Sequence, residues 1–132
     1  MKIKSLAFIY FFIVSAVQAE EIGGYSENYK SCIASANGEH PSMINCIEHE
    51  IELNERAINI MLNTTTGDEI QIKILVSIRK TEPAWAKYIV EKCTIYLELG
   101  GQRGELLQKN CEADATIERS KYIKDLLVAS EI

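Results

Sequence analysis

Four cysteines that follow an export signal constrain this chain more than any other feature. Residues 1–19 are predicted to be a secretory signal peptide: Lys2 and Lys4 make a basic start, an apolar run covers 6–14, and Val17-Gln18-Ala19, with small residues at its two ends, forms a cleavage site. The apolar run is too short to span a bilayer as a stable helix. We therefore expect one domain at 20–132, periplasmic or secreted and without a stable membrane anchor after cleavage; the alternative is a retained anchor.

In an oxidising compartment the cysteines imply two disulfides, for which three pairings are possible. Proximity in the sequence favours Cys32–Cys46 and Cys93–Cys111. Each bridge would close a short loop and stabilise the fold by about 3 kcal/mol. A four-cysteine zinc site is the rival interpretation, but no pair has the close C-x(2–4)-C spacing that such sites show. A redox enzyme would usually carry a C-x-x-C pair, and there is none.

The charge of the chain is acidic. It has 14 basic and 19 acidic residues and a formal net charge of −5, which becomes −5 − 2 = −7 when the two lysines of the signal peptide are removed. A nucleic-acid-binding protein needs a basic surface, so we expect no nucleic-acid partner. An acidic surface does suit a basic protein partner, because complementary charges speed the encounter.

The first half of the domain is predicted to form two helices. Ser26 can cap a helix that runs to about Ala36, and Gly and Pro residues break the chain at 37–41. Ser42 is expected to cap a second helix that ends at the turn-like segment 63–67. The apolar residues of this helix share one face at helical spacing: Ile47, Ile51, Ile58 and Leu62.

The second half is harder to interpret. Residues 70–78 alternate as a strand does, yet a lone strand would have no partner, so we predict a helix that Pro83 either kinks or restarts behind a Thr81 cap. A loop is expected at 99–104 and a short segment at 105–111. A last helix is predicted at 113–128, with Ile117, Ile123, Leu126 and Leu127 in contact with the core. The expected fold is a small all-α domain pinned by two disulfides.

No catalytic motif stands out. A nucleophile needs a base and an orienting group, and neither His40 nor His49 has a recognisable signature around it. His49 and Glu52 would be an incomplete metal site, and the glycines at 100–104 lack the lysine of a phosphate-binding loop. We expect a protein that is not an enzyme and holds no metal or cofactor, with Trp85 in its core.

The cysteines and their neighbours resemble the LprI-like family of bacterial lysozyme inhibitors over 32–126. The matching residues are Cys32, Asn45-Cys46, Glu50, Glu55, Ile58-Asn59, Trp85, Tyr88, Cys93, Gly100-Gly101, Cys111, Thr116 and Arg119. The chain departs from that family at Glu82-Pro83, where the family has Gln-Arg, and at Ile89-Val90, where it has Arg-Asp. The resemblance implies helices, disulfides and binding to lysozyme.

Two hypotheses for the function follow. The first is a protein that binds and blocks a basic lysozyme or a related wall hydrolase; the alternative is an immunity-type envelope module whose partner is not lysozyme. The residues that we expect to contact a partner are Gln102, Arg103, Glu48, Glu52 and Glu55. Those expected to hold the fold are Glu50, Asn59, Trp85, Thr116 and Arg119, with Arg119 paired to Glu50 or Glu55.

Overall fold

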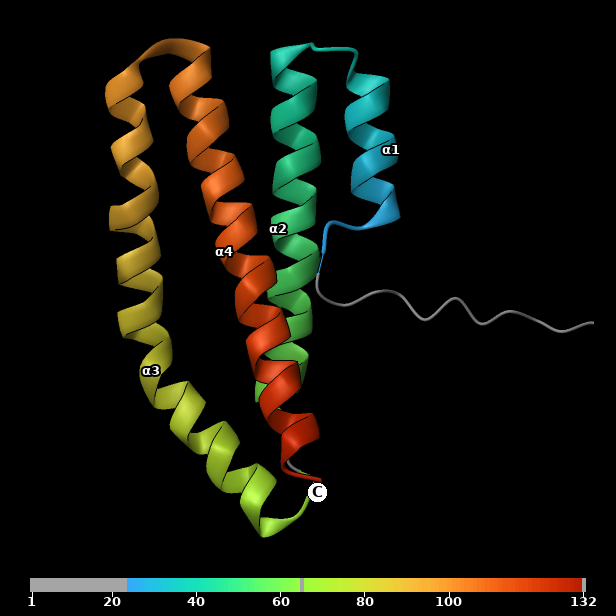
Figure 1. Ribbon diagram of the computed structural model, residues 1–132, viewed down its shortest axis with the longest axis vertical. Coiled ribbons are helices and arrows are strands. Elements are labelled where there is room, and N and C mark those ends of the chain that lie inside the picture. The colour runs from blue at the N-terminus through green and yellow to red at the C-terminus, as the bar shows by residue number, and fades with distance from the viewer. Residues whose placement is uncertain (1–23, 65, 132) are drawn as a thin grey trace, which may run out of the picture.

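The computed structural model describes residues 24–64 and 66–131, and within them the chain is all-α, as predicted. The elements, in chain order, are α1 (Glu27–Ala36), α2 (His40–Leu62), α3 (Glu69–Thr94), the short 3₁₀ helix η1 (Ile95–Leu99) and α4 (Gly101–Ala129). Figure 1 shows α4 between α2 and α3, with α1 on the far side of α2. We call the end at which α2 and α4 begin the upper end, and the end at which α3 begins the lower end.

The first two helices begin close to their expected positions. Ser26 caps α1 by accepting the Tyr29 backbone N–H at 3.0 Å, and α1 ends at Ala36, followed by the capping residue Asn37 with a φ of 50°. The second helix begins at His40, so the prediction that Ser42 caps it is wrong. Pro41 is accommodated in the first turn of α2 because the N–H groups there have no partner within the helix.

Helix α3 resolves the ambiguity at 70–78 in favour of a helix. Asp68 caps it, accepting the Gln71 backbone N–H at 2.8 Å. The helix continues through Pro83, and Figure 1 shows a bend between its lower and upper regions. A proline that removes one backbone hydrogen bond accounts for such a bend. Thr81 is not a cap, because its hydroxyl donates to the Ile78 carbonyl at 2.8 Å inside the helix.

Helix α4 differs most from expectation. The predicted loop at 99–104, the segment at 105–111 and the last helix are replaced by η1 and one helix of 29 residues. Gly104 is buried in the first turn of α4, where a Cβ would lie 2.8 Å from the carbonyl oxygen of Tyr96. The glycine is therefore needed for close packing of η1 on α4. Small residues let the neighbouring helices approach α4 closely. The small buried residues of α4 are Gly104, Ala113, Ala115, Thr116 and Ser120.

The core contains two clusters of buried side chains, and further apolar residues such as Ile44 and Ile47 of α2 are buried outside them. In the lower half, five buried aliphatic side chains from α2, α3 and α4 pack together: Ile58, Leu62, Leu75, Ile78 and Ile123. In the upper half, a smaller cluster joins α3 to α4 and consists of Ile89, Cys93 and Ala115, with Trp85 and Cys111 packed against it. The apolar face predicted for the second helix thus contributes to the lower cluster.

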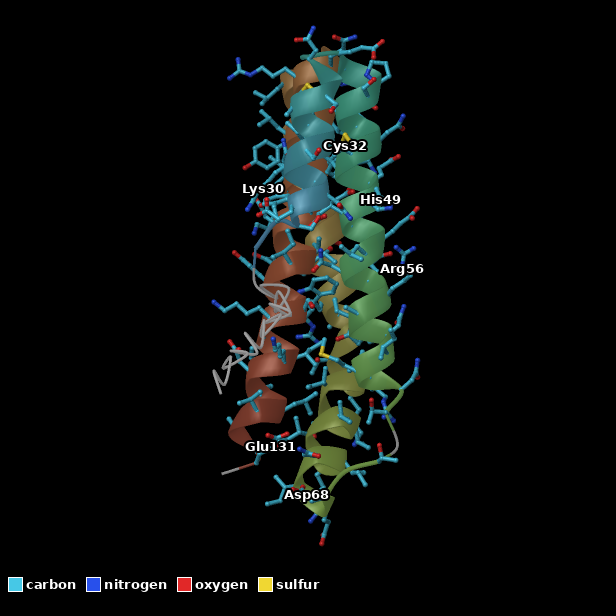
Figure 2. All side chains as sticks on the ribbon, turned by 90° about the vertical axis from the view of Figure 1, so that its right-hand side faces the viewer. Lys30, Cys32, His49, Arg56, Asp68 and Glu131 are labelled. Atoms are coloured by element: carbon cyan, nitrogen blue, oxygen red, sulfur yellow. A yellow bond between two sulfur atoms is a disulfide. The ribbon has the colours of Figure 1, made fainter. Side chains whose placement is uncertain are left out.

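Both predicted disulfides are confirmed. Cys32–Cys46 joins α1 to α2 with a Cα–Cα distance of 5.7 Å, and Cys93–Cys111 joins α3 to α4 with a Cα–Cα distance of 5.5 Å. Figure 2 shows Cys32 in the upper half of the molecule, whereas Asp68 and Glu131 lie near the lower end. None of the helices in the described part of the chain is both long and apolar enough to cross a membrane.

Candidate partner-binding site

The most elaborate side-chain arrangement in the described residues is centred on Arg119 of α4. Its guanidinium group lies 5.5 Å from the ring centroid of Trp85 and 5.6 Å from that of Tyr122. Its Nε donates to Glu82 at 3.0 Å, and its Nη2 donates to Glu82 and, at 3.1 Å, to Thr81. Arg119 is only 9% exposed. The Glu82 carboxylate and the two aromatic faces therefore replace much of the water that a guanidinium group loses on burial.

Helical spacing explains how the sequence assembles this group. Glu82 and Trp85 are three residues apart on α3, and Arg119 and Tyr122 are three residues apart on α4, so each pair shares one face of its helix. The partner of Arg119 is Glu82, so the prediction that Arg119 pairs with Glu50 or Glu55 is wrong. Glu82 stands where the chain departs from the LprI-like pattern.

Two hollows flank Trp85. The first lies between α3 and α4 and is lined in part by Trp85, Tyr88, Lys92, Arg119 and Tyr122. Tyr88 and Tyr122 are each more than half exposed. Tyrosine, tryptophan and arginine are the residue types most enriched at the energetic centres of protein interfaces. This face of the α3–α4 hairpin is therefore suited to recognition.

The second hollow opens between α2 and α3. It is lined in part by Glu55 and Asn59 from α2, Glu82 and Trp85 from α3 and Thr116 from α4. It brings together Glu55, which we expected to contact a partner, and three residues that we expected to hold the fold. Asn59 is exposed, whereas Thr116 is buried and its hydroxyl donates to the Glu112 carbonyl at 2.8 Å.

The other residues expected to contact a partner are spread over α2 and the start of α4. Glu48 lies 3.5 Å from the Lys109 ammonium, and Glu52 lies 3.8 Å from Arg56. Burial works against the Lys109 ammonium, but the hydrogen bond to Glu112 and the charges of Glu112 and Glu48 outweigh it and raise its pKa. Glu48 is therefore engaged within the molecule, while Glu52 stays largely exposed.

Gln102 and Arg103 are exposed in the first turn of α4, not in a loop. The Gln102 carbonyl lies 3.1 Å from Nε2 of His40, which also lies 3.4 Å from Glu105. These contacts join the beginnings of α2 and α4. The predicted contact residues thus fall into two groups, one on α2 and one at the upper end of α4.

Glu50 has a different environment from the other glutamates of α2. It is 1% exposed, and its carboxylate accepts the Ser26 backbone N–H at 2.8 Å and the Ser26 hydroxyl at 2.6 Å. Next to it, the Tyr25 hydroxyl donates to Asp114 at 2.7 Å. Burial, with the hydrogen bond and charge of Asp114, raises the pKa of Tyr25. These contacts fasten the beginning of α1 to α2 and α4.

The sequence-based interpretation missed an apolar projection at the upper end of the α3–α4 hairpin. Four large apolar side chains of η1, which we call the apolar tip, are all exposed: Ile95, Tyr96, Leu97 and Leu99. The signal was the run Ile-Tyr-Leu-Glu-Leu before Gly100, which leads into the predicted loop. In residues 24–64 and 66–131, by contrast, no three His, Cys, Asp or Glu side chains gather closely enough to hold a metal ion.

Comparison with known proteins identifies the family. A model of the family described as antitoxin TsiV3 matches residues 37–130. The antitoxin protein TsiV3 of Vibrio cholerae serotype O1 (strain ATCC 39315 / El Tor Inaba N16961) is 31% identical over 108 residues, covering 71% of this chain and 80% of the relative. The chain belongs to the TsiV3 antitoxin family. No solved structure matches.

Membership of the TsiV3 family favours the second of the two functional hypotheses, the immunity-type module. Both matches carry the name of an antitoxin, and neither supports the resemblance to the LprI-like lysozyme inhibitors. The matched range contains α2, α3, η1 and α4 but not α1. The hollows beside Trp85 and the apolar tip therefore both lie within the segment of the chain that defines the family.

Proposed function

We propose that this chain is an immunity protein that binds a toxin and neutralises it by direct contact. The observation that carries the proposal is the match of residues 37–130 to the TsiV3 antitoxin family. That range supplies the three long helices and the face around Trp85. A binding protein of this size needs a surface that is ordered before the partner arrives, because ordering side chains on binding costs affinity.

The architecture suits neutralisation by binding. Two disulfides and the Arg119–Glu82 pair join neighbouring helices, so the exposed tyrosines of the hairpin are presented on a braced frame. The two buried charged groups of the described residues make contacts within the molecule: Arg119 of α4 pairs with Glu82 of α3, and Glu50 of α2 accepts hydrogen bonds from Ser26 at the beginning of α1. Stoichiometric binding by such a surface requires no catalytic group.

We further propose that the toxin is met in the periplasm. Disulfides form and persist in oxidising compartments, and this chain contains two of them. The signal peptide predicted at 1–19 would deliver the protein to that compartment; it lies outside the described residues. A toxin neutralised there has its target outside the cytoplasm.

A wall-cleaving hydrolase related to lysozyme is the toxin class that we favour. The cell wall is exposed to the periplasm, so an enzyme that cleaves it acts where this immunity protein would be. The formal net charge, −5 for the whole chain and −7 without the two lysines of the predicted signal peptide, would also steer the protein towards a basic hydrolase. Glu52 and Glu55, exposed on α2, would contribute to that attraction.

The test is a protection experiment followed by a titration. Cells that lack the gene should be killed in mixed culture with the parental strain, and the full chain supplied in trans should rescue them. A matched variant that lacks residues 1–19 should stay in the cytoplasm and fail to rescue.

The purified chain should then titrate the purified toxin to a fixed molar end point. Protection far below equimolar amounts would contradict neutralisation by binding. Wall digestion by the isolated toxin tests the finer proposal, and a toxin without that activity would overturn the hydrolase assignment while leaving the immunity function intact.

A further inference from the structure

We propose that the hollow between α3 and α4 binds a short segment of cell-wall glycan. The hollow has a volume of about 430 Å³, within the range of about 300–1,000 Å³ that small-molecule sites occupy. The class of ligand follows from the side chains that line the hollow. The source of that ligand, the cell wall, rests on the proposed periplasmic function, because the wall is the glycan to which that compartment gives access.

The hollow has a floor and a rim of different chemistry. Its floor includes the half-buried Trp85 and the buried Arg119. Its rim consists of four exposed side chains, which are Tyr88 and Lys92 of α3 and Glu118 and Tyr122 of α4. Trp85 and Lys92 are seven residues apart on α3 and therefore lie about 10 Å apart along the helix axis. This length accommodates a disaccharide unit of a linked glycan.

The aromatic side chains provide surfaces on which sugar rings can stack. A pyranose ring carries C–H groups on its faces, and these pack on the electron-rich face of an aromatic ring. The Arg119 guanidinium group lies 5.5 Å from the ring centroid of Trp85 and 5.6 Å from that of Tyr122. It is itself fixed by Glu82, to which its Nε donates at 3.0 Å. Rings that are ordered in advance lose little conformational entropy on binding.

The charged residues of the rim suit the polar edge of a sugar. Lys92 and Glu118 are exposed, and neither forms an ion pair with another described residue. Their donors and acceptors can therefore serve the hydroxyl and acetamido groups at the edge of a sugar ring. The stem peptides of the wall also carry carboxylates, which the Lys92 ammonium group would attract.

A protein is a less suitable occupant of this hollow. A stable protein interface buries roughly 800 Å² on each partner, more than one hollow of this size offers. The exposed residues of its rim are aromatic or charged, so the rim is not a continuous aliphatic patch of the kind that a second copy of the chain would cover. A ligand with apolar faces and polar edges matches both parts of the site.

The fluorescence of Trp85 provides the first measurement, because Trp85 is the only tryptophan of the chain. The probes are chitotetraose, the neutral tetramer of N-acetylglucosamine, and soluble wall fragments that retain their stem peptides. We expect both probes to shift the emission of the wild-type protein in a saturable way, and the wall fragments to bind more tightly. Lys92→Gln should remove the preference for the wall fragments while binding of chitotetraose is retained.

Substitutions at the rim locate the site. Tyr88→Ala and Tyr122→Ala should each weaken the binding of chitotetraose by at least about 5-fold through the loss of a stacking surface. Val90→Ala is the matched control, because Val90 is exposed on α3 outside the hollow, and its affinity should stay within about 2-fold of the wild type. Thermal unfolding checks that every variant keeps the fold. Tyrosine variants that melt and bind like the wild type overturn the proposal.

Sedimentation with intact wall sacculi and titration with the purified toxin separate this site from the immunity function. A wild-type chain that binds neither probe nor the sacculi overturns the proposal, even when it protects cells. A chain that binds the glycan but neither protects cells nor binds the toxin refutes the immunity function alone. If the wild type ignores the glycan while Tyr88→Ala weakens toxin binding or abolishes self-association, the hollow is a protein interface and the proposal is overturned.

Discussion

In the lower half of the molecule α2, α3 and α4 close on five aliphatic side chains, whereas in the upper half α3 shares with α4 only a small apolar cluster and a disulfide. Figure 1 shows why the halves differ: above its bend, α3 lies beside α4 and away from α2. The comparison teaches that a disulfide supplements a small apolar contact where α3 packs on α4 and not on α2, and that this arrangement leaves side chains such as Tyr88 of the upper hairpin exposed.

Removing a side chain from the lower cluster should have the largest effect. Ile123 is fully buried among residues of all three long helices. Ile123→Ala should lower the free energy of unfolding by about 4 kcal/mol through lost burial and a residual cavity. Val128→Ala, at an exposed position of the same helix, should change it by less than about 0.5 kcal/mol. Urea unfolding measures both, and equal losses would contradict the role of Ile123 in the lower cluster.

Breaking a disulfide probes the upper half. Cys93→Ala with Cys111→Ala should lower the free energy of unfolding by about 3 kcal/mol. Amide hydrogen exchange should then show lost protection around η1 while the amides of the lower cluster stay protected, because that cluster does not depend on the bridge. Cys32→Ala with Cys46→Ala is the matched control and should expose α1 instead. Uniform loss of protection in both variants would mean that the two halves unfold as one.

Arg119 lies between the two clusters and links α3 to α4. Arg119→Ala would leave Glu82 without its cation and Trp85 without the guanidinium group. We therefore expect the free energy of unfolding to fall by about 2 kcal/mol. Arg119→Lys keeps the charge but cannot reproduce the planar contacts, so it should recover only a fraction of that loss. Urea unfolding of both variants measures the difference. Full rescue by lysine would show that charge alone holds the two helices.

The smallest effect is expected at Tyr25. The pKa of Tyr25 is raised above its usual value of 10.0, first by burial and then by Asp114. Its phenol therefore stays protonated in the folded state while the unfolded chain ionises, and the stability present below about pH 10 declines as the pH rises further. Tyr25→Phe should lower the free energy of unfolding by about 1 kcal/mol near neutral pH. Above pH 10, however, the free energy of unfolding of this variant should fall less steeply than that of the wild type. Parallel pH profiles from urea unfolding would contradict this.

The sequence predicted those features that depend on strong local signals. Ser26 indicated the start of α1, and the spacing of Ile47, Ile51, Ile58 and Leu62 indicated the buried face of α2, although Ile51 is only half-buried. The two disulfides followed from proximity along the chain. The helical interpretation of 70–78 rested on a global argument, that a strand would lack a partner, and the structure supports it.

The features that were missed depend on contacts between helices. The first half of α4 contains glycines that usually mark a loop, but Gly104 is helical and its lack of a side chain lets η1 pack directly against it. The buried residues in the first half of α4 are small, so no stripe of large apolar residues indicated a helix there. The pairing of Arg119 with Glu82 depends on how α3 and α4 face each other, and no spacing within one helix reports that.

The apolar tip has a consequence for how this protein can evolve. Because its four side chains lie outside both core clusters, they can be exchanged without disturbing the packing below. Gly104 and the Cys93–Cys111 bridge have no such freedom, since one permits the close backbone contact and the other closes the hairpin. Substitutions confined to residues 95–99, with Gly104 and the Cys93–Cys111 disulfide unchanged, would let related proteins acquire new partners while the stability of the fold stays constant.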